Sequence, residues 1–122
     1  MTEIYTVTRD KAIELLEKAV AEKGADYVYE PPTPALHVCQ YIDDDGHPSC
    51  IVGHVVKYLA DELGNHDIFT ELEEYEGNSA HDIALPGVTI LPEASMVLAV
   101  AQEVQDSMEY TWGNALERAR EH

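Results

Sequence analysis

The sequence predicts an α+β fold that is predominantly helical, with four to five helices packed around a small β-hairpin. Several segments carry apolar residues at three- and four-residue spacing, which is the helical pattern, and two short β-prone segments flank a proline cluster. The apolar fraction of 45% is ordinary for a folded protein. Because 122 residues suffice for one core only, residues 1–122 are expected to form a single acidic globular domain.

The first helix is predicted between Thr8, a suitable N-cap, and Gly24, a suitable terminator. A short strand is predicted before it, over residues 4–7. Residues 27–29 and 36–42 then predict the two strands of the hairpin, which ends in a turn at residues 43–46.

Four further elements follow. A helix is expected from Pro48 to Gly64, because proline suits a first helical position and glycine a C-terminal cap. A short helix is predicted over residues 67–76, an extended segment over 88–91 and a long helix over 92–110. A final helix follows the N-cap Thr111.

The net charge is the most unusual property of the chain. There are 24 acidic and 7 basic residues, giving −17, and between Gly24 and Glu117 the only basic side chain is Lys57. Such a field repels phosphate backbones and anionic lipids, so direct binding to nucleic acid or a membrane surface is disfavoured. A protein partner with a basic surface is favoured instead.

The carboxylates of two segments are the candidate partner-binding residues. In residues 67–76, acidic side chains recur every three or four positions and so form a ridge on a helix. The full candidate face consists of Asp43, Asp44, Asp45, Asp67, Glu71, Glu73, Glu74 and Glu76. The alternative is a solvated surface without a partner, as in proteomes that are acidic throughout.

A cluster of histidines and cysteines allows a zinc hypothesis. The ligands would be Cys39, His47, Cys50 and His54, with His37 as an alternative to His47. The ten-residue separation of the cysteines argues against it, because structural zinc ligands usually come in closely spaced pairs. No cofactor is therefore expected, and zinc is retained as the alternative.

A small thiol-dependent enzyme is a further alternative, with Cys50 as nucleophile and His54 or His47 as base. The neighbouring aspartates would raise the pKa of the thiol, and no orienting third residue is evident. An EF-hand also fails, because the position that needs a glutamate is His54. With no phosphate loop and no hydrolase or metalloprotease motif, we expect a protein without enzymatic activity and assign no catalytic residue.

Apolar residues 96–101, which begin with Met96 and end with Ala101, surround nearly two turns of the predicted long helix. Such a helix is buried, either in the centre of the domain or in a homodimer contact. No apolar run approaches the ~20 residues of a membrane span, and no signal-peptide pattern occurs. With only two cysteines, the chain is expected to be cytoplasmic, with both thiols reduced.

Three segments, GADYVY at 24–29, CQYIDDDGHPSCIVGHV at 39–55 and AQEVQDSMEYTWGNALERA at 101–119, resemble a group of small actinobacterial and actinobacteriophage proteins. That group has no established activity. The resemblance implies a cytosolic accessory protein of an actinobacterium or of its phage, which in the second case acts in the host cytoplasm. By analogy with small phage proteins, it favours binding of a host protein over catalysis. The hypothesis is a non-enzymatic protein–protein interaction module, with nucleic-acid-like charge mimicry as one mode of binding.

Overall fold

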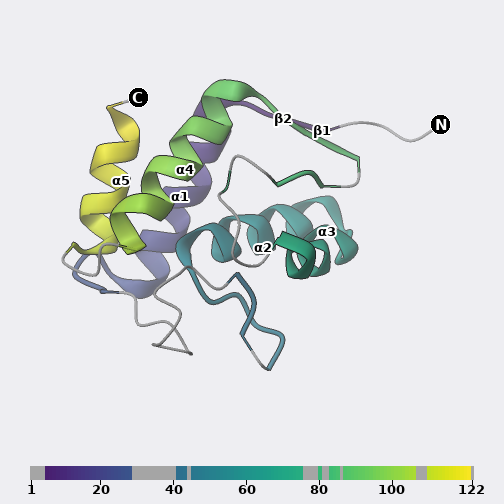
Figure 1. The fold of residues 1–122 in the computed structure, drawn as a ribbon, viewed down its shortest axis with the longest axis horizontal. Coiled ribbons are helices and arrows are strands. Elements are labelled where there is room, and N and C mark those ends of the chain that lie inside the picture. The colour runs from purple at the N-terminus through teal and green to yellow at the C-terminus, as the bar shows by residue number, and fades with distance from the viewer. Residues whose placement is uncertain are drawn as a thin grey trace.

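The computed structural model describes residues 5–28, 41–43, 45–75, 80, 83–85, 87–106 and 110–121 (Figure 1). Its elements in chain order are β1 (Tyr5–Val7), α1 (Arg9–Lys23), α2 (Ile51–Leu63), α3 (Asp67–Thr70), the 3-10 helix η2 (Glu71–Tyr75), β2 (Val88–Ile90), α4 (Pro92–Asp106) and α5 (Trp112–Arg120). This arrangement confirms the predicted α+β, predominantly helical fold class.

The core lies between α1, α2, α4 and α5. Helix α4 packs against α5, α1 and α2, and Figure 1 shows α2 running crosswise to α1 and α4 from near their lower ends. The apolar stretch of α4 is used inside this core, because Val97, Leu98 and Ala101 are buried, whereas Met96 is 44% exposed. The core of one chain therefore buries three residues of the stretch, while Ala99 and Val100 are half-buried.

The sheet of the described residues is parallel and differs from the predicted hairpin. Strand β1 pairs with β2 in the register Tyr5 to Val88, and Val7 to Ile90. Each strand leads directly into a helix, β1 into α1 and β2 into α4, and these helices pack side by side. The two strands consequently run in the same direction. Both had been predicted as short extended segments, but their pairing had not.

The predicted hairpin strands lie largely outside the described residues. Tyr27 and Val28 are described and do not belong to a strand. The Tyr27 carbonyl accepts a hydrogen bond from the Trp112 backbone amide at 2.8 Å. At the far end of the predicted second strand, Ile42 pairs with Pro48 in an isolated antiparallel bridge.

Helix α1 begins and ends where its caps predict. The Thr8 side chain accepts a hydrogen bond from the Lys11 amide, and Gly24 closes the helix at a φ of 96°. Helix α2 ends as expected at Gly64 in the left-handed conformation, but it begins at Ile51, three residues after Pro48. Pro48 is engaged in the bridge to Ile42, so it cannot serve as the first residue of the helix.

The N-terminus of α2 is satisfied from a distant helix. Cys50 at the N-cap makes no side-chain capping bond. The buried Gln105 side chain of α4 instead accepts a hydrogen bond from the Ile51 amide at 2.7 Å. One turn earlier in α4, Gln102 accepts from the Ala80 amide and donates to the Tyr41 hydroxyl, both at 2.8 Å. These glutamines attach the loop segments to the helical core.

The predicted short helix at 67–76 is divided into α3 and η2, and Glu76 lies outside the described residues. Its apolar stripe is confirmed, since Ile68 and Leu72 are buried and Tyr75 packs against the core. No helix in the described part of the chain is long and apolar enough to cross a membrane.

Candidate functional site

Helices α3 and η2 present four carboxylates, which we call the acidic ridge: Asp67, Glu71, Glu73 and Glu74. The apolar side chains of the same segment, Ile68, Phe69 and Leu72, are buried in the core. Three of the four acidic residues are exposed, and Glu71 is half-buried. Burial of the apolar side therefore fixes the carboxylates on the solvent side of the same short segment.

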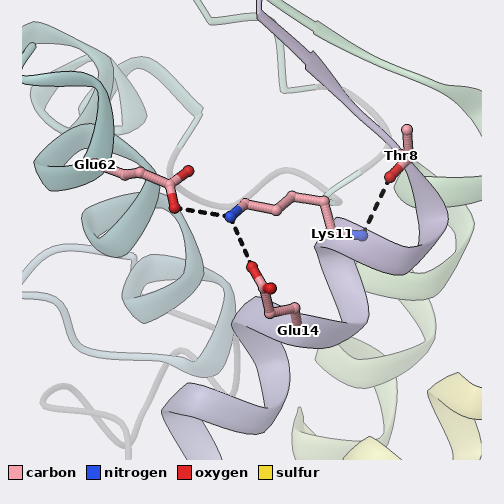
Figure 2. A network of polar contacts seen from close by, with 4 residues as sticks. All are labelled: Thr8, Lys11, Glu14 and Glu62. Atoms are coloured by element: carbon pink, nitrogen blue, oxygen red, sulfur yellow. Dashed lines mark hydrogen bonds and ion pairs between the residues drawn. The ribbon is translucent and has the colours of Figure 1, made fainter.

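Several basic residues pair with carboxylates outside the acidic ridge. Figure 2 shows the largest group, in which the Lys11 ammonium contacts Glu14 at 2.6 Å and Glu62 at 2.8 Å, so that α1 is joined to α2. The Thr8 cap lies at the start of the same helix. Hydrogen bonds to the two carboxylates raise the pKa of Lys11, and the ammonium in turn lowers the pKa of Glu14.

Other cations are similarly engaged. Lys57 pairs with Asp61 at 2.8 Å, and Arg120 pairs with Glu17 at 2.9 Å. Lys18 and Lys23 lie over the rings of tyrosines, 4.7 and 5.6 Å from the centroids. Within the described residues, no salt bridge reaches the acidic ridge. Lys57 also lies 5.6 Å from the centroid of the Phe69 ring in α3, but its ion pair is with Asp61. The ridge carboxylates are therefore left for solvent or for a partner.

The aspartate turn that precedes α2 forms a second acidic group. One oxygen of Asp43 accepts hydrogen bonds from the amides of Asp45 and His47, both at 2.9 Å, and Gly46 takes the positive φ of 82° that the turn requires. Potential ligand atoms of Asp43, Asp45 and His47 lie within 4.8 Å of one another. Asp44 lies outside the described residues.

Asp43 and Asp45 were predicted for the acidic face and His47 for a zinc set, so the sequence reasoning missed that these three come together. The spacing of two residues in a tight turn is the signal that could have found them. The turn leads into the first residue of α2, whereas the ridge follows its last residue. The candidate acidic face is thus divided between two elements.

Cys50 requires a correction. It is buried and disulfide-bonded, in contrast to the reduced thiol that was expected. The only other cysteine of the sequence, Cys39, lies outside the described residues, as does His37. A sulfur in a disulfide supplies neither a thiolate nucleophile nor a thiolate ligand, so Cys50 serves neither role in this state. Disulfides persist in oxidising compartments, so the cysteines no longer argue for the cytoplasm.

His54, the other predicted partner of Cys50, is buried one turn into α2. Its Nδ1 lies 2.9 Å from the Cys50 carbonyl oxygen. Burial lowers the pKa of His54 and Lys23 adds to the effect, although the Cys50 hydrogen bond and Glu22 oppose it. Among the described residues, His54 does not join a group of potential metal ligands.

Comparisons with protein-family models, curated proteins and solved structures found no significant match to this chain.

Proposed function

We propose that this protein is a non-enzymatic interaction module that binds a basic surface of a protein partner through the acidic ridge. The observation that carries the proposal is the distribution of charge. The ion pairs given for the described residues lie on α1, α2 and α5, and Lys57 approaches the ridge segment only through the ring of Phe69, whereas the four ridge carboxylates have no salt bridge among the described residues. A row of uncompensated charges attracts a complementary surface and repels nucleic acid and anionic lipid.

The spacing of the ridge supports charge mimicry as the mode of binding. From Asp67 to Glu74 the chain makes about three α-helical and four 3-10 steps, which rise roughly 12 Å in total. Four charges over that length correspond to one charge per about 3–4 Å, against roughly 3.4 Å along one DNA strand. The ridge thus suits a cleft that holds a single nucleic-acid strand. If the chain is phage-encoded, as its resemblance implies, the partner is a host protein.

The test uses two variants with the same change in net charge. The ridge variant carries Asp67→Asn, Glu71→Gln, Glu73→Gln and Glu74→Gln. The control variant replaces four exposed carboxylates of α4, α5 and the residue after α5 by Glu93→Gln, Glu103→Gln, Glu117→Gln and Glu121→Gln.

Each protein is immobilised and incubated with lysate of the source organism at low and high salt, and the retained proteins are identified and then purified. We expect the wild type and the control variant to bind the same basic protein. The ridge variant should bind it at least about tenfold more weakly, which corresponds to roughly 1.4 kcal/mol. High salt should weaken binding of the wild type, and single-stranded nucleic acid should compete. If both variants lose the same affinity for the partner, net charge alone accounts for the binding and the acidic ridge is not the binding site.

A divalent cation site is the second candidate, favoured by the grouping of Asp43, Asp45 and His47. Two carboxylates and an imidazole match the oxygen and nitrogen ligands of zinc, so this set replaces the cysteine-based one. No thiolate is needed, and the site is compatible with the disulfide of Cys50.

Zinc binding should be measured by titration calorimetry without reducing agent, so that free thiols do not compete. We expect His47→Ala to weaken zinc binding at least about tenfold, because it removes the only nitrogen ligand. His66→Ala, which changes an exposed histidine outside the group, should leave it unchanged. Equal zinc affinities of the two variants would contradict the site. If calcium binds and His47→Ala does not change its affinity, the ligands of the turn are the carboxylates alone.

A further inference from the structure

His54 is the only buried imidazole, ammonium, guanidinium or carboxyl group among the described residues. Its ring lies 5.2 Å from the ring of Trp112 in an edge-on arrangement and 6.4 Å from the ring of Tyr58. Its Nδ1 donates to the Cys50 carbonyl, which can only accept. The neutral ring therefore carries its proton on Nδ1, and Nε2 is the atom that takes up a second proton.

Trp112 connects this imidazole to the start of α5. The indole is fully buried and stands edge-on to Tyr27, with 4.7 Å between ring centroids. The amides of Trp112 and Gly113 donate to the carbonyls of Tyr27 and Ala25. At Gly113 an added Cβ would lie 2.8 Å from the Ala25 oxygen, so the two backbones are in direct contact. The N-terminus of α5 and residues 24–28 thus form one unit, which meets His54 through Trp112.

This contact is costly even when His54 is neutral. The buried indole Nε1 of Trp112 has no hydrogen-bond partner among the described residues. An unsatisfied buried donor carries a desolvation penalty, and opening towards water would remove it. Because of this cost, a small further free-energy penalty from protonation of His54 can shift the equilibrium from the state in which Trp112 is packed to one in which it is open to water.

The charges around His54 set the direction of the effect. From α1, Lys23 opposes protonation and Glu22 favours it. From α2, Tyr58 faces the ring, donates its hydroxyl proton to Glu22 and is covered by Lys18. In residues 24–28, Tyr27 is the titratable residue that contacts Trp112. The group of α5 that faces the His54 imidazole is the uncharged indole of Trp112. Desolvation is the largest influence on the pKa of His54, so the packed state prefers the neutral ring.

We propose that His54 and Trp112 form a pH-sensitive contact, in which proton uptake at Nε2 of His54 releases Trp112, the N-terminus of α5 and residues 24–28 from α2. In the released state His54 is hydrated and its pKa returns towards the ordinary value of about 6.5. The packed state is therefore fully favoured above that pH. It loses stability as the pH falls below 6.5, and the loss levels off below the lowered pKa of packed His54.

The single tryptophan of the chain allows a direct test. We expect its fluorescence to shift reversibly to the red below pH 6.5, while the far-ultraviolet circular dichroism keeps most of its helical signal. His54→Gln, which cannot titrate, should abolish the shift. His66→Gln, which changes an exposed histidine, should retain it. A shift that persists in His54→Gln, or that coincides with loss of the helical signal, would overturn the proposal.

A second measurement needs no variant and applies even if His54→Gln does not fold. Hydrogen exchange of the wild type, corrected for the intrinsic pH dependence, should show loss of protection at the Trp112 and Gly113 amides below pH 6.5. The amides of α4 should stay protected. Unchanged protection of Trp112 and Gly113 relative to α4 would refute the pH-sensitive contact. The contact does not involve the acidic ridge, so the two proposals fail independently.

Discussion

Replacing Gly53 with alanine should destabilise the protein by about 2 kcal/mol or more. A Cβ at this position would lie 2.2 Å from the carbonyl oxygen and 3.1 Å from the carbonyl carbon of Tyr41. Both are backbone atoms, and the oxygen also accepts the Ser49 amide, so neither can move without disturbing the turn. Alanine is the better helix former by about 1 kcal/mol, but that gain is smaller than the cost of the overlap.

Urea unfolding of the wild type and Gly53→Ala measures this difference, with Gly64→Asn as the control. Gly64 is the C-cap of the same helix and has no atom within 4 Å of a built Cβ, and asparagine tolerates its left-handed conformation. The control should change the free energy of unfolding by less than about 1 kcal/mol. If Gly53→Ala is as stable as the wild type, α2 and the segment at Tyr41 do not approach each other as described.

Replacing Gln105 with methionine should cost about 1–3 kcal/mol of stability. The substitution nearly preserves side-chain volume, so the loss of hydrogen bonds dominates. The Ile51 amide loses its acceptor at 2.7 Å, and the Asp106 carboxylate loses a donor at 3.0 Å. Because Cys50 provides no side-chain cap, the first amide of α2 would be left unsatisfied in a buried position.

Glu103→Met, on the exposed side of the same helix, is the matched control and should alter stability by less than about 0.5 kcal/mol. Chemical denaturation of both variants provides the comparison. Gln105→Glu extends it, since the carboxylate could still accept from Ile51 but would place a second negative charge beside Asp106. We expect that variant to be at least as unstable as Gln105→Met at neutral pH. A stable Gln105→Met protein would mean that the Ile51 amide is satisfied by another group.

Local signals predicted the helices well. Thr8 and Thr111 cap α1 and α5, and Gly64 closes α2, because each of these residues satisfies neighbouring backbone groups without help from the rest of the fold. The start of α2 was predicted three residues early. Pro48 is locally suited to a helix N-terminus, but its pairing with Ile42 determines its conformation.

The candidate site was only partly predictable. The composition of residues 67–76 predicted a ridge of carboxylates, since helical spacing alone places acidic and apolar residues on different sides. That no salt bridge among the described residues reaches the ridge depends on contacts such as Lys11 to Glu62, which are 51 residues apart. The grouping of Asp43 and Asp45 with His47 depends on the geometry of one turn.

By itself, the sequence determined the excess of negative charge, the helical segments and most of their ends, because these depend on composition and on interactions within a few residues. Only the tertiary structure decided the parallel pairing of β1 with β2, the capping of α2 by Gln105 and the burial of His54 against Trp112. Each of these joins residues more than fifty positions apart. No local pattern specifies such a partner, because it is selected by how the helices pack around one core.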